Sequence, residues 1–259
     1  MKTLRFIGMA LFAFLMCVNF AACSSDDEPK IDDESGIVAS EKKLVEIKHV
    51  DEDGDTSIIS FNYDSKGRLI FKKGGVNGDT YYTWGANAII AKHDWGAKTM
   101  NLNSKGNITN VEWDNASDVF FTYDFVNQLV SFEAEWGITN FHWENGKIYK
   151  STFDYGYDEI ETTYTYEKST CKGYFPLYST YYLDTDSYEI SLAHPELLGL
   201  RCSQLPNRII EKKDDREKII EFYYMLDNLG YVESCTTKEI YVESGSKNTY
   251  TTVWFFKWQ

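Results

Sequence analysis

Two tryptophans, a histidine and a glutamate lie close together between residues 136 and 144, and these residue types can bind sugars. Trp136 and Trp143 supply flat rings that can stack on a sugar face, while His142 and Glu144 can bond its hydroxyl groups. The same rings could instead fill a protein core, where large apolar side chains are usually buried. The sequence therefore gives these four residues as candidate contacts to a ligand, with a core role for the tryptophans as the alternative.

Catalytic and metal-binding patterns are weak in this chain. The four histidines have no metal-ligand spacing and stand in no recognised catalytic motif: His49, His93, His142 and His194. The acidic segment 51–55 resembles the start of a calcium loop, but Thr56 and Asn62 occupy the positions that need glycine and glutamate, so a hairpin turn is favoured. We expect no enzymatic activity, no cofactor and no metal. A glycan-active hydrolase is the weaker alternative, because paired carboxylates need proximity in space rather than in sequence.

The overall charge argues against nucleic acid as a partner. The chain of 259 residues has 26 Lys and Arg against 40 Asp and Glu, which gives a net charge of −14. Phosphate binding needs clustered basic residues, and the sequence has no basic stripe.

The amino terminus has the layout of a secretory signal. Lys2 and Arg5 precede an apolar run over residues 6–20, and small residues then lead to Cys23. The segment Phe20-Ala21-Ala22-Cys23 resembles the lipobox of bacterial lipoproteins. That resemblance implies cleavage before Cys23 and a membrane partner held through lipid on Cys23. A plain signal peptide with an incidental cysteine is the alternative.

The residues after Cys23 are small, polar and acidic, and they resemble the export signal of surface lipoproteins in Gram-negative gut anaerobes. This expected signal consists of Ser24, Ser25, Asp26, Asp27 and Glu28. The resemblance implies a lipid-anchored protein of the cell outer membrane that faces the exterior. An acidic tether without an address is the alternative. Residues 23–40 hold too few apolar side chains to fold, so we expect a flexible tether there.

Three cysteines follow in the body of the chain: Cys171, Cys202 and Cys235. An odd number allows at most one internal disulfide, and an envelope location would permit it. Three scattered cysteines do not make a disulfide framework, so buried free thiols are favoured.

From Lys43 onward the hydrophobic pattern has a period of two. Phe61 and Tyr63 alternate with polar residues, and so do Phe121 and Tyr123, which is typical of strands. Glycine turns separate these runs, as at Lys66-Gly67 and Asn145-Gly146. An internal repeat starts at residues 61, 82, 100, 121 and 141, a spacing that fits one hairpin per unit. An Asp or Asn at the strand end could bond the backbone of its own turn.

The cleanest unit, residues 63–69, resembles the tyrosine–aspartate repeat of bacterial surface proteins. The chain as a whole resembles a porin-like family of unknown function among lipoproteins of gut anaerobes. That family has a lipobox, an acidic leash, serial hairpins and a helical insertion before the last strands, here at residues 194–200. This resemblance brings no known activity or site.

These observations predict an all-β protein. Serial antiparallel hairpins would form a meander that curves into a sheet or partial barrel, with one short helical insertion near residues 194–200. The expected domains are a signal peptide at 1–22, a tether at 23–40 and a single β-rich domain at 41–259. Membrane-spanning strands are not expected, because they need about 9–11 residues with a lipid-facing apolar side. The predicted function is a non-catalytic binding module for a glycan or a protein, and the alternative is a structural or assembly lipoprotein without a small ligand.

Overall fold

The computed structural model describes residues 42–75, 77–113, 116–171, 185–200 and 204–259. The expected signal peptide, lipidated Cys23, the export signal and the whole tether lie outside these ranges, as does Cys202. Among the described residues are sixteen strands, one α-helix and one 3-10 helix: β1 (Leu44–Val50), β2 (Thr56–Tyr63), β3 (Leu69–Lys73), β4 (Thr80–Trp84), β5 (Ala88–His93), β6 (Gly96–Leu102), β7 (Ile108–Trp113), β8 (Ala116–Tyr123), β9 (Leu129–Ala134), β10 (Gly137–Glu144), β11 (Lys147–Asp154), β12 (Glu159–Thr170), α2 (Thr185–Ala193), η1 (Pro195–Leu198), β13 (Gln204–Lys213), β14 (Arg216–Leu226), β15 (Val232–Glu243) and β16 (Ser246–Trp258).

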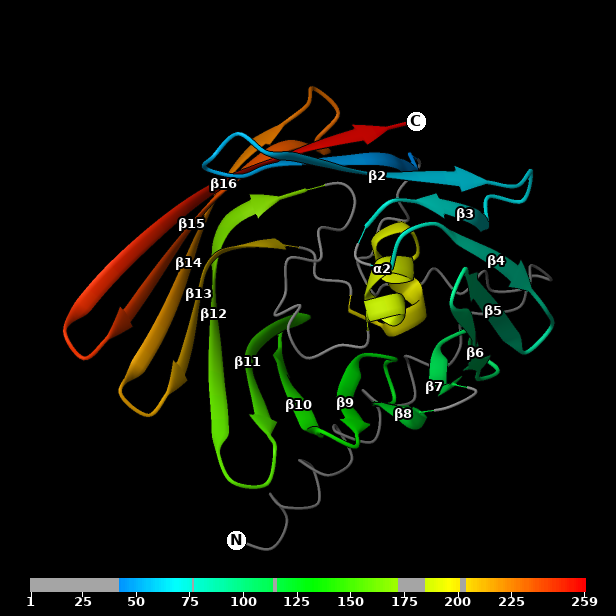
Figure 1. The fold of residues 1–259 in the computed structure, drawn as a ribbon, viewed down its shortest axis with the longest axis horizontal. Helices are drawn as coiled ribbons and strands as arrows, with labels where there is room; N and C mark the ends of the chain where they lie inside the picture. Colours follow the sequence, from blue (N-terminus) through cyan, green and yellow to red (C-terminus); the bar gives the residue numbers. More distant parts are fainter. Residues whose placement is uncertain (1–41, 76, 114–115, 172–184, 201–203) are drawn as a thin grey trace, which may run out of the picture. The chain divides into compact units, whose positions relative to one another are not determined.

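Each strand pairs antiparallel with its neighbours in sequence, and the first strand also pairs with the last (Figure 1). Ile47 of β1 is the register partner of both Ile59 of β2 and Phe256 of β16. The backbones of Lys43 and Gln259 exchange two hydrogen bonds of 2.7 and 2.8 Å beyond the ends of these strands. The sheet is therefore a closed barrel. The serial meander expected from the sequence is confirmed, and the expected incomplete barrel is corrected.

The reason for closure lies in the inward face of β16. Trp254, Phe256 and Trp258 all contribute to the core, and the facing residues of β1 are the buried Leu44 and Ile47. Because a barrel has no edge strand, the pairing of β1 with β16 satisfies backbone groups that an open sheet would leave exposed. A pairing between segments about 200 residues apart leaves no local pattern in either of them.

Because the strands form a meander, alternate turns lie at alternate ends of the barrel. One end, the entry end, holds Lys42 and Lys43, where the described chain enters β1, and every connection from an even-numbered to an odd-numbered strand. The other end, the opposite end, holds every connection from an odd-numbered to an even-numbered strand.

The connection from β12 to β13 contains α2 and η1, and α2 lies within the curve of β2 to β10 (Figure 1). The helical insertion predicted near residues 194–200 is confirmed there as η1, and α2 extends it toward the amino terminus. Ile190, Leu197 and Leu198 are buried against the apolar inner wall. No helix among the described residues is long and apolar enough to cross a membrane.

Candidate functional site

Three of the five repeat units, those that start at residues 61, 100 and 121, and two further hairpins have five-residue turns with one shared geometry. In each, the Oδ1 atom of the first Asp or Asn accepts hydrogen bonds from the backbone N–H groups two and four residues later. Within the described ranges these turns are Asp51–Asp55, Asp64–Arg68, Asn103–Asn107, Asp124–Gln128 and Asp227–Tyr231. The fourth residue has a positive φ, such as 76° at Gly67 and 71° at Asn127. The prediction that these side chains bond their own turns is confirmed, and the calcium-like segment 51–55 is one of these hairpin turns.

A second repeated contact joins neighbouring strands at the entry end. A Tyr or Trp near the end of an even-numbered strand donates a hydrogen bond of 2.6–2.8 Å to a carbonyl near the start of the preceding odd-numbered strand. We call these rings the latch aromatics. The donor and acceptor pairs found among the described residues are Tyr63–Leu44, Trp84–Leu69, Tyr123–Ile108, Trp143–Leu129, Tyr166–Ile148, Tyr224–Pro206 and Trp258–Val232.

The latch tyrosines are held in their donor form. Burial raises the pKa of Tyr63, of Tyr123 and of Tyr224 well above the ordinary tyrosine value. Each phenol therefore stays protonated at any physiological pH. β6 is the exception in the series, because it carries Leu102 where the other even-numbered strands carry the ring.

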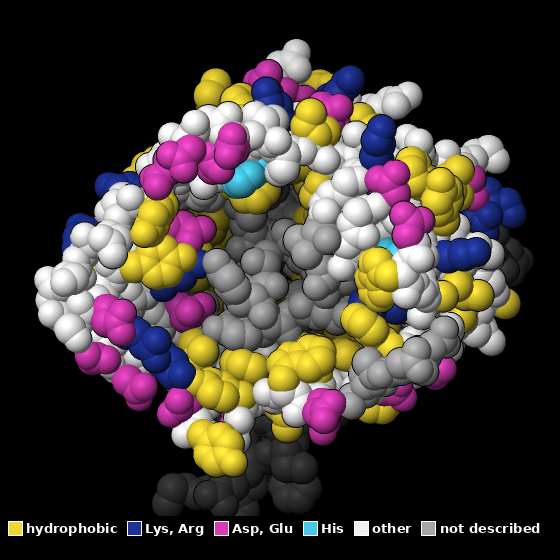
Figure 2. Space-filling model, in the orientation of Figure 1, with side chains coloured by type: hydrophobic (Ala, Val, Ile, Leu, Met, Phe, Trp, Pro, Cys, Tyr) yellow, Lys and Arg dark blue, Asp and Glu magenta, His cyan; other side chains and the backbone are white. Residues whose placement is uncertain are grey.

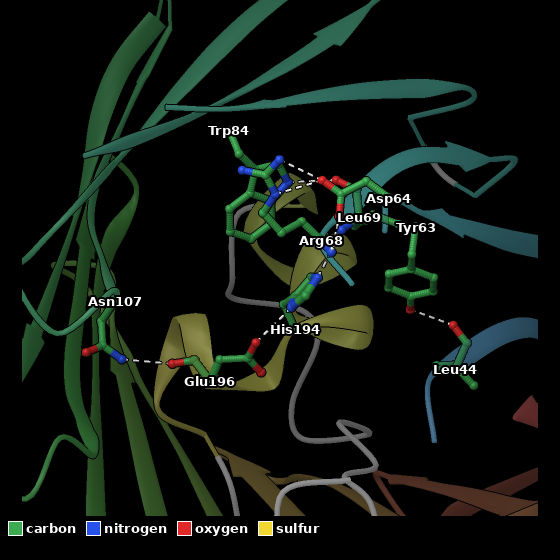
Figure 3. A network of polar contacts seen from close by, with 9 residues as sticks. All are labelled: Leu44, Tyr63, Asp64, Arg68, Leu69, Trp84, Asn107, His194 and Glu196. Carbon is green, nitrogen blue, oxygen red and sulfur yellow. Dashed lines mark hydrogen bonds and ion pairs between the residues drawn. The ribbon is translucent and has the colours of Figure 1, made fainter. Parts of the chain in front are cut away.

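The insertion docks onto the same repeated positions. The backbone N–H of Leu69 donates to Nε2 of His194 over 3.1 Å, and the Leu69 carbonyl accepts the bond from Trp84 (Figure 3). Farther round the wall, the Asn107 side chain donates to the Glu196 carbonyl over 2.8 Å, and the N–H of Leu129 donates to the Gly199 carbonyl over 3.4 Å. Residues 194–199 are therefore held by the starts of β3 and β9 and by the turn before β7.

The hydrogen bonds of His194 determine its tautomer. A backbone N–H can only donate, so Nε2 is unprotonated while it accepts from Leu69. Nδ1 lies 2.7 Å from Oε1 of Glu196, so it carries the proton and donates to that carboxylate (Figure 3). The ring also packs edge-on against Trp84, with 5.1 Å between the ring centroids. His194 therefore connects the insertion to the start of β3 and to the latch aromatic Trp84.

A buried ion pair fixes the other part of the insertion. Nζ of Lys72 lies 2.5 Å from Oε2 of Glu189 in α2, and the two side chains are 0% and 2% exposed. Lys72 also donates to the Gly74 carbonyl over 2.9 Å. Gly75 has a φ of +85°, and a Cβ atom there would collide with the Glu189 carboxylate. The glycine is therefore required both by its backbone conformation and by this close approach.

A cluster of polar and aromatic residues lies at the opposite end. Nδ1 of the buried His93 is 3.1 Å from Oγ1 of Thr80, and the His93 ring stacks on Trp95 with an angle of 4° between the planes. Nζ of the buried Lys98 lies 3.2 Å from the centroid of the Trp113 ring, a cation–π contact. The buried His93 ring therefore covers one face of the Trp95 ring, although Trp95 is 55% exposed.

Two glutamates surround one lysine on the inner wall of β13 to β15. Lys218 is the register partner of Glu211, and its Nζ lies 3.0 Å from Oε2 of Glu239. Burial raises the pKa of the Glu211 carboxyl, an effect that the Lys218 ammonium opposes and Glu239 reinforces. The hydroxyl of Tyr241 donates to the same Glu239 oxygen over 2.7 Å. Lys218 thus offsets one of the two carboxylates in this cluster.

The tryptophans divide into two groups. Five are partly buried and pack against the core: Trp84, Trp113, Trp143, Trp254 and Trp258. The other two, Trp95 and Trp136, are 55% and 48% exposed. Both occupy the second position of a two-residue turn at the opposite end, Asp94-Trp95 before Gly96 and Glu135-Trp136 before Gly137. The sequence interpretation missed Trp95, although this shared acid–Trp–Gly pattern could have indicated it.

The four predicted ligand contacts do not gather in one place. Trp136 is exposed at the opposite end, whereas Trp143 packs against the core at the entry end and donates to the Leu129 carbonyl. Seven residues of strand separate them, which is about 23 Å. His142 and Glu144 are exposed near Trp143 at the entry end. Their role as ligand contacts stays a prediction, and the geometry allows Trp136 and Trp143 to contact only different parts of a ligand.

The thiols and metal ligands add no further site. Cys235 is a free thiol and is fully buried. Over the described parts of the chain, no three His, Cys, Asp or Glu side chains come together as metal ligands.

Comparison with known proteins gives a likeness of fold. No family model matches the chain, and no curated protein matches it. A solved structure described as a porin-like protein from Bacteroides uniformis is similar, with a TM-score of 0.69 and 16% sequence identity. The alignment covers 86% of this chain and 98% of that one. The likeness supports the porin-like character expected from the sequence. The lipoprotein family and the tyrosine–aspartate repeat remain interpretations of the sequence.

Proposed function

We propose that this chain is a lipid-anchored protein of the cell envelope, displayed on the outer membrane, that binds a glycan without catalysis. The observation that supports binding is the pair of exposed tryptophans, Trp95 and Trp136, in equivalent turns at one end of the barrel. The proposed lipid anchor depends on Cys23, and the proposed surface display depends on residues 24–28.

A glycan fits this pair better than a compact ligand does. The two hairpins are four strands apart, which places the rings about 19 Å apart along the wall. Each ring follows an acidic residue, Asp94 or Glu135, that can accept hydrogen bonds from sugar hydroxyls. Stacking with a supported ring such as Trp95 contributes on the order of 1 kcal/mol beyond area burial. Two such contacts would give a weak, extended site.

Several features argue against a spanning pore. β1 to β11 have five to eight residues each, whereas a strand that crosses a bilayer needs about 9–11, a length reached among the described strands by β12 to β16. Charged side chains face outward on several strands, including Lys92, Glu112 and Glu133. Hydrophobic, acidic and basic side chains intermingle on the face of the molecule seen in Figure 2. The insertion also occupies part of the barrel interior. These features support a barrel that is anchored to the membrane and does not cross it.

Affinity electrophoresis tests the binding site. Purified protein would run in native gels that contain soluble plant, host or bacterial polysaccharides, and a glycan array would survey shorter chains. Trp95→Ala and Trp136→Ala should each weaken the retardation about tenfold. Phe125→Ala is the matched control, because Phe125 is an exposed aromatic residue at the entry end.

The outcomes separate the proposed function from its alternatives. Retardation that survives the change of both tryptophans would overturn the site. Absence of any glycan binding, together with capture of a purified envelope protein that depends on Trp95 and Trp136, would replace the glycan with a protein ligand. Absence of both would favour the structural lipoprotein.

A further inference from the structure

Apolar side chains stand exposed at the tips of two entry-end turns. Phe125 and Val126 in the turn between β8 and β9 are 89% and 55% exposed, and Leu229 in the turn between β14 and β15 is 49% exposed. The Asp124 and Asp227 caps hold both turns rigidly by backbone hydrogen bonds. Exposure of these apolar side chains to water is unfavourable, and they have no role in the core that would offset that cost. Exposed apolar groups of this kind indicate a contact to another surface.

The corresponding tips of two other turns are basic. Lys66 and Lys105 are exposed, and each is the third residue of its turn, as Val126 and Leu229 are in theirs. Nζ of Lys105 donates to the carbonyl of Phe125 over 3.3 Å, so a basic tip and an apolar tip are in contact. Apolar side chains flanked by lysines are the combination that settles into the headgroup region of a bilayer.

The two ends of the barrel differ in charge. The described short turns of the opposite end carry ten acidic and no basic side chains: Asp51, Glu52, Asp53, Asp55, Asp79, Asp94, Glu135, Asp158, Asp214 and Asp215. The described short connections of the entry end carry five basic side chains against three acidic ones: Lys42, Lys43, Lys66, Arg68 and Lys105 against Asp64, Asp124 and Asp227. Lys42 and Arg68 are ion-paired with Asp227 and Asp64, so the entry-end connections have little net charge. An anionic surface therefore repels the opposite end much more strongly than the entry end.

We propose that the entry end docks on an anionic phospholipid surface, with Phe125, Val126 and Leu229 among the headgroups and Lys66 and Lys105 against the phosphates. The inference rests on the proposed function for its source of membrane, which is the lipid on Cys23. Only 18 residues lie between Cys23 and Lys42, and a chain of that length spans at most about 65 Å. The anchor thus keeps the entry end close to the bilayer, where weak contacts suffice. Docking in this orientation turns Trp95 and Trp136 away from the membrane.

Vesicle flotation tests the docking without the acyl chains. The protein would be the chain from residue 23 onward with Cys23→Ser, which contains the whole barrel. The vesicles would be phosphatidylethanolamine and phosphatidylglycerol at about 3:1, with pure phosphatidylcholine for comparison. The parent should float with the anionic vesicles, and about 1 M NaCl should weaken this binding. The triple variant F125S/V126S/L229S should bind about tenfold more weakly.

Tyr157→Ser is the matched control, because Tyr157 is 97% exposed in a turn of the opposite end. It should bind the vesicles as the parent does, and melting curves should show that all variants fold. Equal flotation of the triple variant and the parent would overturn the docking surface, and so would an equal loss from Tyr157→Ser. Polysaccharide retardation of the triple variant should be unchanged, so failure of the docking and failure of the glycan site give different results.

Discussion

Trp143 and Trp136 lie near the two ends of one strand, β10, and their surroundings differ. Trp143 packs against the core and its Nε1 donates to the Leu129 carbonyl over 2.7 Å. Trp136 is half exposed, and its ring centroid is 6.3 Å from that of the buried Phe132. A ring that closes a hairpin cannot also leave it to stack on a ligand without losing that hydrogen bond. The chemistry available to each tryptophan is therefore set by its place along the strand.

Stability measurements should separate these two roles. Trp143→Ala should lower the free energy of unfolding by roughly 3 kcal/mol, because it removes a large ring packed against the core. Trp143→Phe keeps most of the ring and loses only the hydrogen bond, at a cost of about 1 kcal/mol. Trp136→Ala should change stability by less than about 1 kcal/mol. Urea titration of the three variants provides the values, and a large loss from Trp136→Ala would assign that ring to the core instead.

The thiol of Cys235 gives a prediction that depends on pH. Burial raises the pKa of this thiol to about 12, so it remains protonated throughout pH 7–9. The thiolate is the nucleophile, and its fraction stays very small over that range. Iodoacetamide should therefore leave Cys235 unmodified at pH 8 in the folded protein and modify it in urea. Peptide mass mapping of the native and the urea-treated samples would show this, and rapid native labelling of Cys235 would contradict it.

At the scale of elements, the barrel wall and the insertion depend on each other. The turn caps and latch aromatics position the first residues of odd-numbered strands, and the N–H groups of Leu69 and Leu129 then point to the insertion. His194 and the Gly199 carbonyl accept those hydrogen bonds. A buried backbone donor without a partner costs about 1–3 kcal/mol. The barrel wall would therefore be less stable if the insertion were absent and these N–H groups had no acceptor. The insertion is thus part of the wall's hydrogen bonding.

The ion pair between Lys72 and Glu189 should show this dependence most clearly. Glu189→Gln leaves a buried ammonium without its charge partner, and we expect a loss of roughly 3–5 kcal/mol. The double variant Lys72→Met with Glu189→Leu removes both charges and should recover much of that loss. Glu161→Gln is the control, because it breaks the exposed pair with Lys150 and should have a much smaller effect. Equal losses in the single and double variants would show that the pair does not couple the insertion to the wall.

The elements also show what a sequence can reveal. The alternation of Phe61 and Tyr63 and the Asp64–Gly67 turn are local patterns, so strands, turns and the capping of turns could be predicted. The closing pair of strands could not, because Ile47 and Phe256 are brought together only by the complete set of hairpins. The candidate site could not be predicted in full for the same reason, because it also depends on positions that only the folded barrel defines. Trp136 and Trp143 look alike in sequence. Only the structure shows that Trp143 lies at the entry end of β10 as a latch aromatic and that Trp136 lies at the opposite end.

At the scale of the whole molecule, the barrel has two ends of different chemistry. The entry end receives the chain that follows Cys23 and carries basic and apolar tips, whereas the opposite end is acidic and carries the exposed Trp95 and Trp136. A closed meander favours such a division, because alternate turns always fall at the same end. The strand order therefore allows one end to specialise in attachment and the other in binding.

In the proposed function, the lipid anchor depends on Cys23 and the surface display depends on the acidic residues that follow it. If Cys23 is the acylated residue, Cys23→Ser should abolish labelling by a radioactive or alkyne-bearing fatty acid and leave an uncleaved precursor. If residues 24–28 direct export, protease added to intact cells should degrade the parent. Replacement of Asp26, Asp27 and Glu28 by Ala should then protect the protein while its acylation persists. Acyl labelling of the Cys23→Ser protein would remove the anchor from this account. Equal protease sensitivity of the parent and the triple Ala variant would leave the anchor in place and reduce the acidic run to a tether, since lipidation and export are read from different residues.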